Sequence, residues 1–122
     1  MQKSDEDKIF TLLQSVSVQT KEITKYLEEM DYGNSININK LSELYSRREN
    51  NLEILNKFCK SKYWSDFYKN NHIEWEDVYQ PLVRADKGNL DILEKSVKII
   101  SEKLRILLKK KSILVYTREV KK

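Results

Sequence analysis

The sequence predicts an all-α protein, an antiparallel bundle of three to four helices whose last helix is much longer than the others. The first observation is the scarcity of helix breakers, since 122 residues include two glycines and one proline. The second is that Lys, Glu, Leu and Ile, which favour long helices, dominate the composition. The third is that apolar residues recur at alternating steps of three and four. A chain of this length suits one domain, residues 1–122.

The first helix is expected over residues 4–32 and the second over residues 38–60. Ser4 precedes three acidic residues, a pattern typical of a helix N-terminus, and Gly33 suits a left-handed C-cap. Asn37 or Asn39 caps the second helix. The short connection between the two helices makes them antiparallel neighbours in an αα-hairpin.

Residues 61–71 are the most irregular stretch, and one short helix is expected over residues 62–70. The surrounding aromatic side chains are Tyr63, Trp64, Phe67, Tyr68, Trp75 and Tyr79. Such a cluster either plugs the end of a bundle where the chain reverses or anchors a partner, and the plug is the preferred interpretation.

The long helix is expected over residues 74–116, after an N-cap at Asn71 that Glu74 supports. A kink or break is expected near Pro81, and Gly88 and residues 109–111 are further candidates. The apolar repeat on this helix comprises Tyr79, Val83, Asp86, Leu90, Leu93, Val97, Ile100, Leu104, Leu107, Lys111 and Leu114. A second apolar series includes Val78, Ala85, Ile92, Ile99, Ile106 and Ile113. The stripe is therefore wide enough to face two or more neighbours.

Two charged residues fall on the inward stripes, Arg48 on the second helix and Asp86 on the long one. They are predicted to approach each other as a buried polar pair, or each to cap its own side of the core while its charged end reaches solvent. The alternative is that a rotation of the helices leaves both in water.

The long helix, at roughly 60 Å, outreaches the first, at roughly 40 Å. The stripe is expected to be core up to about Leu104 and to overhang beyond it. Exposed apolar side chains on an overhang mark a binding surface. The predicted substrate groove comprises Ile99, Leu104, Ile106, Leu107, Ile113 and Leu114.

Nothing in the sequence predicts an enzyme, a metal site or a cofactor. His72 and Cys59 are each the only residue of their type, which excludes His-rich metal sites, zinc fingers and redox pairs. Cys59 is expected to be a buried structural thiol rather than a nucleophile paired with His72. The lone cysteine and the lack of a spanning apolar run predict a cytoplasmic protein without membrane insertion.

The basic C-terminus raises the question of nucleic acid. Lysines 109–111 and Arg118 lie at a helix C-terminus, where the helix dipole favours cations, and no aromatic residues are interleaved with them for base stacking. A protein partner is therefore expected rather than a nucleic acid.

The C-terminal part of the chain resembles the flagellar type III export chaperones of the FliT and FlgN kind. Residues 110–116 read Lys-Lys-Ser-Ile-Leu-Val-Tyr and are similar to the family's ending, in which a helical segment closes on a tyrosine. Residues 81–89, Pro-Leu-Val-Arg-Ala-Asp-Lys-Gly-Asn, resemble its third helix, and Arg47-Arg48-Glu49 fits its second. The family often follows the tyrosine with glycine, whereas Thr117 follows it here.

The resemblance implies a small cytoplasmic helical bundle that binds the helical C-terminal segment of a late export substrate, the filament cap or hook–filament junction protein. Such chaperones deliver the substrate to the export ATPase complex and the export gate, and the gate contact maps onto Tyr116. A monomer or weak dimer is expected. The alternative is a homo-oligomeric helical scaffold, in which self-association covers the same stripe, and a basic nucleic-acid-binding protein is the third hypothesis.

Overall fold

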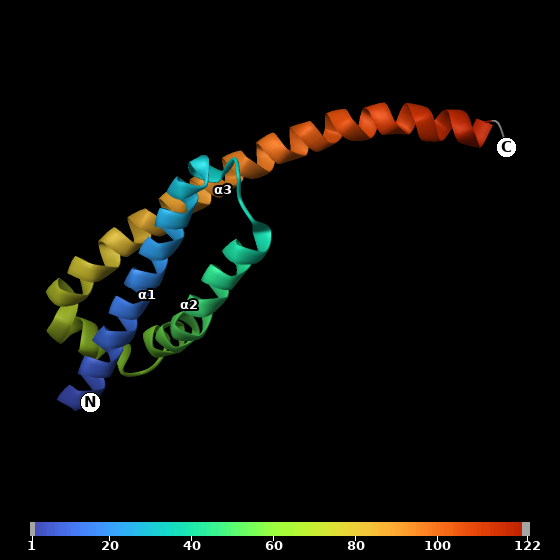
Figure 1. The fold of residues 1–122 in the computed structure, drawn as a ribbon. Helices are drawn as coiled ribbons and strands as arrows, with labels where there is room; N and C mark the ends of the chain where they lie inside the picture. The colour runs from blue at the N-terminus through green and yellow to red at the C-terminus, as the bar shows by residue number, and fades with distance from the viewer. Residues whose placement is uncertain (1, 121–122) are drawn as a thin grey trace.

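The computed structural model describes the backbone of residues 2–120 and the side chains of residues 2–106. Its elements in chain order are α1 (Lys3–Glu29), the short 3₁₀ turn η1 (Asp31–Gly33), α2 (Ile38–Cys59) and α3 (Trp64–Val120) (Figure 1). The described residues contain no strand. The prediction of an all-α bundle with a long C-terminal helix is confirmed.

The first helix differs from its prediction at both ends. Gln2 rather than Ser4 is the N-cap, and no side chain caps the helix there. At the other end α1 stops at Glu29, because Asp31, Tyr32 and Gly33 all have positive φ, at 53°, 51° and 98°. The left-handed conformation expected of Gly33 alone therefore begins two residues earlier, at positions where non-glycine residues seldom adopt it.

The connection from α1 to α2 is held by two local contacts. The side chain of Asn37 accepts a hydrogen bond from the Lys40 amide at 3.2 Å and caps α2. The backbone amide of Asn37 donates to the Tyr26 hydroxyl at 2.9 Å, which ties the start of α2 to the last turns of α1. The two helices form the antiparallel hairpin.

Helix α3 is interrupted once, at Asn71, whose φ and ψ of −131° and 15° are not helical. The Asn71 side chain donates to the Phe67 carbonyl at 3.0 Å, so it satisfies the end of the preceding short helix. The kink expected near Pro81 is absent, and Gly88 is helical as well, since Asn71 is the only non-helical residue found within α3. Pro81 has no amide hydrogen to donate to the carbonyl of Asp77, four residues earlier, yet the helix continues through it.

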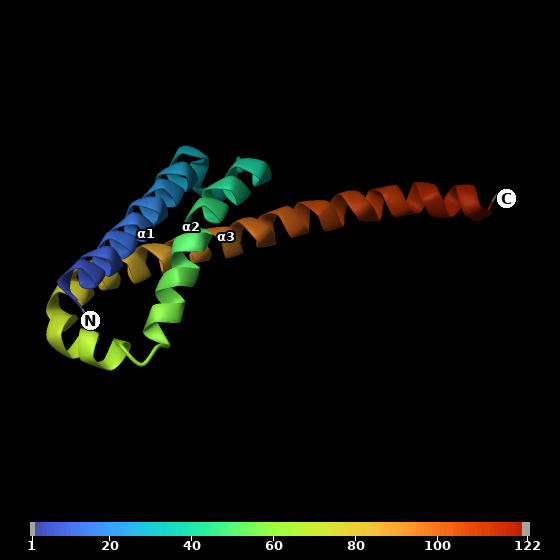
Figure 2. The same cartoon turned by 90° about the horizontal axis from the view of Figure 1, so that it is seen from below.

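Helix α1 is the central element, because it packs against both α2 and α3, whereas the backbones of α2 and α3 seldom approach each other. Figures 1 and 2 show that α3 then leaves the bundle and projects as a long, gently curved rod toward the C-terminus. Residues 97–106, the described side chains beyond Ser96, are all exposed. We call residues 97–120 the overhang.

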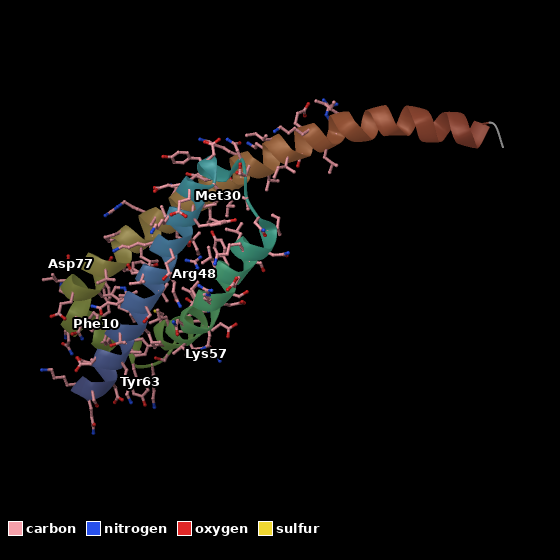
Figure 3. All side chains as sticks on the ribbon, viewed as in Figure 1. Phe10, Met30, Arg48, Lys57, Tyr63 and Asp77 are labelled. Atoms are coloured by element: carbon pink, nitrogen blue, oxygen red, sulfur yellow. The ribbon has the colours of Figure 1, made fainter. Side chains whose placement is uncertain are left out.

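The core is divided into two apolar clusters. The larger one contains Leu13, Val16, Leu55, Phe67, Trp75 and Leu82, and the smaller one contains Ile23, Leu27 and Leu44. Between them lie the buried polar side chains of Thr20, Arg48 and Asn89, one from each helix. Figure 3 shows Arg48 pointing into the space between the helices.

Candidate functional site

One face of α3, which we call the inner seam, packs on α1 and the turn η1. Its buried members are spaced seven residues apart, and between them lie half-buried Val78, Ala85 and Ile92. These buried members are Trp75, Leu82, Asn89 and Ser96. A spacing of seven keeps side chains on one helix face, so this is the face that the bundle covers.

The apolar repeat predicted to form the core is a different face, which we call the open seam. It consists of Tyr79, Val83, Asp86, Leu90, Leu93, Val97, Ile100 and Leu104. Leu90 is 49% exposed and Val97 is 60% exposed, and Asp86 and Leu93 are the only half-buried members. The prediction that this stripe is covered up to about Leu104 is therefore wrong for most of its members, because the backbones of α2 and α3 seldom approach each other. Asp86, which reaches Arg48, and Leu93, which packs on the smaller apolar cluster, are the covered exceptions.

A groove of about 410 Å³ opens where α2 and α3 diverge. Leu13 and Val16 of α1 line it, together with Leu52 and Leu55 of α2. The other lining residues are Asn56, Cys59, Trp64, Tyr68, Trp75, Glu76, Tyr79 and Leu82. The lining is largely apolar and aromatic with few polar groups, as in sites that bind apolar segments. The shared residue Tyr79 connects the groove to the open seam.

The aromatic cluster closes this end of the bundle. Phe67 and Trp75 are buried and meet edge to face with ring centroids 5.9 Å apart, and Trp64 meets Trp75 at 5.0 Å. Such contacts stabilise a core beyond the area that they bury. Tyr63 and Tyr79 remain exposed. The cluster is thus a plug on its inner side and a wall of the groove on its outer side.

The structure brings Arg48 and Asp86 together in the middle of the bundle. Arg48 Nη2 lies 2.8 Å from Asp86 Oδ1, with exposed fractions of 8% and 32% for the two side chains. Arg48 Nη1 also donates to Thr20 Oγ1 at 2.8 Å, and the Thr24 hydroxyl donates to Asn89 Oδ1 at 2.9 Å. All three helices therefore meet in one polar layer, which constrains their mutual register.

The polar layer is not fully satisfied. Arg48 Nε, Asp86 Oδ1 and the Tyr45 hydroxyl are buried, and among the described residues none of them has a hydrogen-bond partner. The ion pair of Arg48 with Asp86 thus has a short distance without the angle of a hydrogen bond. Burial raises the pKa of the Tyr45 hydroxyl, nearby Arg48 opposes that rise, and Asp86 adds to it. Each unpaired buried group costs stability, so this layer contributes less than a fully bonded network would.

Two groups in the groove have raised pKa values. Burial raises the pKa of the Cys59 thiol, which makes it less reactive than a free cysteine at neutral pH. A hydrogen bond to Glu76 at 2.8 Å raises the pKa of the Tyr68 hydroxyl. His72 Nδ1 lies 3.4 Å from the Lys69 carbonyl, and its ring centroid lies 6.1 Å from that of Tyr68, whose hydroxyl bonds to Glu76 instead.

The predicted substrate groove does not match this one. Ile99, Leu104 and Ile106 are exposed on the overhang and are not among the residues that line the groove. The side chains of Leu107, Ile113, Leu114 and Tyr116 lie outside the described residues. Sequence reasoning did not identify Leu52 and Leu82 as residues that line the groove. One sequence signal, however, could have shown where α1 stops covering α3. Beyond Ser96 the inner-seam positions continue as Ile99, Lys103 and Ile106, and a lysine there indicates that α1 no longer covers α3.

No protein-family model, curated protein or solved structure matches this chain. Within the described part of the chain, no group of three or more His, Cys, Asp and Glu side chains could hold a metal ion. A search of the same residues finds no helix with the length and apolar character that crossing a membrane requires.

Proposed function

We propose that the protein is a helix-binding chaperone without enzymatic activity, in which the groove between α2 and α3 receives an amphipathic helical segment of its client. The observation that carries this proposal is the apolar groove of about 410 Å³, continuous through Tyr79 with the exposed open seam. Amphipathic helices bind such grooves through apolar residues three and four positions apart.

The client class follows from the resemblance to the flagellar export chaperones. It is the helical C-terminal segment of a filament cap or hook–filament junction protein, which the chaperone delivers to the export apparatus. Tyr116 makes the contact with the export gate in this proposal. The resemblance rests on residues 110–116, 81–89 and 47–49, and the second of these stretches includes the open-seam residues Val83 and Asp86.

The groove supplies its own signal for a binding experiment. Trp64 and Trp75 are the two tryptophans of the chain, and both line the groove. Synthetic C-terminal helices of the cap and junction proteins from the same genome are titrated into the chaperone while tryptophan emission is recorded. Burial of the groove shifts this emission, and a binding isotherm follows.

A matched pair of variants on α2 localises the binding. Leu52→Asp places a charge in the groove and lowers the affinity for the peptide at least tenfold, because the charge has no partner there. Ile54→Asp changes an exposed residue that does not line the groove, and the affinity stays within about twofold. Equal effects of the two variants, or no binding by any of the peptides, would rule out this site and client class.

The gate contact has a separate test. Tyr116→Ala leaves folding and peptide binding unchanged and weakens docking to the purified cytoplasmic domain of the export gate. Docking with wild-type affinity would remove Tyr116 from its proposed role without affecting the groove.

A further inference from the structure

The two parts of the chain on either side of Ser96 carry opposite charge. Residues 1–96 contain fourteen Lys and Arg against seventeen Asp and Glu, a net charge of −3. Residues 97–122 contain nine Lys and Arg against two Asp and Glu, a net charge of +7. The overhang itself, residues 97–120, contains seven of these Lys and Arg against two Glu, a net charge of +5, so it is a basic helix attached to an acidic bundle. Such an arrangement favours contact between the overhang of one molecule and the bundle of another.

The two faces of α3 also continue differently into the overhang. The inner seam acquires Lys103, while the open seam stays apolar through Val97, Ile100 and Leu104, all more than half exposed. The apolar surface is thus continuous from the groove to the overhang along one side of α3. In each molecule the bundle lacks a neighbour on this side, and the overhang has an apolar face to offer.

We infer that a second copy of the chain covers the open seam, with the two α3 helices antiparallel. Antiparallel coiled coils pair the two kinds of apolar position of the 3,4 repeat with each other. Registers that differ by whole heptads all meet this requirement. In the one proposed here, Val97 lies opposite Ile100 of the second copy and Leu93 lies opposite Leu104. By two-fold symmetry each contact occurs twice, so four central layers consist of described, apolar side chains.

The charged members of the repeat select this register. From Tyr79 to Leu114 the repeat contains two charged residues, Asp86 and Lys111. The same register places them in one layer, where their charges compensate. A shift of one heptad in either direction would put Asp86 opposite Leu104 or Lys111 opposite Leu93. Asp86 is one-third exposed, so the side away from Arg48 remains accessible to a second copy.

The lengths of the helix segments fit the same arrangement. In this register residues 97–120 lie beside residues 77–100 of the second copy, so each overhang spans the α3 segment of the opposite bundle. The bundles meet end to end without overlapping, because the covered part of α3 ends at Ser96. In each half, α1, α2 and α3 together with the second overhang form a four-helix arrangement. The layers from Val83 to Leu114 extend over more than four heptads and are apolar apart from the layer of Asp86 and Lys111. This length suffices for a stable coiled coil.

The acidic residues beside the groove complement the basic overhang. Glu49 lines a hollow on α2 beside Tyr45 and Arg48, and Arg48 pairs with Asp86 at the same level of the bundle. In the proposed register lysines 109–111 lie beside residues 86–88 of the second copy, and Lys103 lies beside Glu94. Salt therefore weakens the dimer, since these charges are near the surface.

A cross-linking experiment tests the direction and register of the helices. In a Cys59→Ser background, Val97→Cys and Ile100→Cys are made separately, and the two proteins are mixed under mild oxidation. The mixture gives a disulfide-linked heterodimer in at least tenfold excess over the homodimer that either protein gives alone. Efficient homodimer formation by Val97→Cys alone would indicate parallel helices and overturn the inference. So would a purely monomeric species in sedimentation at about 100 μM chain, a concentration at which even a weak dimer forms.

A second pair of variants tests the charged layer. Lys111→Glu places a like charge opposite Asp86 and raises the dimer dissociation constant at least tenfold, whereas Lys110→Glu, next to the seam, changes it less than threefold. Equal effects of the two variants would show that overall charge, not this layer, drives association. Dimerisation and peptide binding have separate readouts, sedimentation and tryptophan emission. Sedimentation can thus contradict the proposed dimer without affecting the proposed client site, and tryptophan emission can contradict the client site without affecting the dimer.

Discussion

The two seams of α3 have similar helical spacing but opposite environments. The inner seam begins with the buried apolar residues Trp75 and Leu82 and continues with the small or polar residues Ala85, Asn89 and Ser96, and it is covered by α1 and η1. The open seam contains larger apolar residues such as Leu90, Val97 and Leu104, and these remain about half exposed. From Ala85 onward the more apolar face is thus the one that the fold leaves uncovered.

The difference follows from how closely the backbones approach. A Cβ atom added to Gly33 would lie 1.9 Å from Ser96 Oγ and 3.3 Å from an Ile92 methyl carbon, so the turn η1 rests directly on the inner seam. Asn89 joins α1 through hydrogen bonds with Thr24 and with the carbonyl of Thr20. At this end of the bundle small and polar groups thus allow α1 and η1 to approach α3 closely, while Leu90 and Val97 on the open seam remain available for a partner.

The largest expected effect is a difference in the free energy of unfolding between alanine substitutions on the two seams. Leu82→Ala removes an inner-seam side chain that is 8% exposed and lowers the free energy of unfolding by about 2–4 kcal/mol. Leu90→Ala removes the same atoms from the open seam and costs less than about 1 kcal/mol. Urea unfolding at a concentration where the chain is monomeric measures both. A similar loss for the two variants would show that the open seam is covered within one molecule.

The second effect concerns the polar layer that joins the seams to α2. Arg48→Met breaks the contacts with Asp86 and Thr20 and lowers stability by about 2 kcal/mol, because Asp86 loses its partner. The neighbour Arg47 pairs with Glu43 on the exposed side of α2, and Arg47→Met changes stability by less than about 0.5 kcal/mol.

Replacing both partners of the Arg48–Asp86 pair sharpens that test. The double variant Arg48→Met/Asp86→Leu recovers part of the stability that Arg48→Met loses, since no unpaired carboxylate remains in the layer. Thermal unfolding of the wild type, of Arg48→Met, of Asp86→Leu and of the double variant measures the recovery. If Arg48→Met costs no more than Arg47→Met, the polar layer does not hold the helices together.

The third effect uses the two glycines as a matched pair. Gly33→Ala introduces a side chain at φ +98° and against Ser96, and it lowers stability by about 1–2 kcal/mol. Gly88→Ala adds a methyl group to a helical position with nothing within 4 Å, and it raises stability by about 0.5–1 kcal/mol. Opposite signs in urea unfolding support the contact of η1 with the inner seam, and equal signs contradict it.

The helices themselves could be predicted because their signals are local. Apolar spacing, the Asn37 cap and the break at Asn71 depend on neighbouring residues in the chain. The end of α1 could not be predicted in the same way. Asp31 and Tyr32 adopt positive φ, which their residue types do not favour, so packing of the turn on α3 decides the conformation.

The site was less predictable because three positions in each heptad of α3 are apolar. That pattern permits several rotations of the helix, and the one found buries Leu82 rather than Leu90. The proximity of Arg48 and Asp86 could be anticipated, since each is a charged member of a largely apolar stripe on its helix, and the structure places them 2.8 Å apart. The groove could not, because it depends on how far α2 diverges from α3, and no residue of either helix specifies that distance alone.

The smallest expected effect is the pH dependence of the groove side of α2. Burial raises the pKa of the Cys59 thiol above its ordinary value of 9.0 and that of the Tyr45 hydroxyl above 10.0. Between the unfolded and folded pKa values the unfolded chain binds fewer protons, so stability falls as pH rises through this alkaline range. Urea midpoints from about pH 8 to about pH 10.5 measure the slope, which covers the ordinary range of both groups.

The contribution of these two groups can be isolated by removing their titration. The double variant Cys59→Ala/Tyr45→Phe loses both ionisable groups, and its stability falls less steeply with pH than that of the wild type. The lysines titrate in the same range in both proteins, so the difference between the slopes belongs to α2. Identical slopes would mean that Cys59 and Tyr45 are as well solvated in the folded chain as in the unfolded one. The groove side of α2 would then be as open as the open seam of α3.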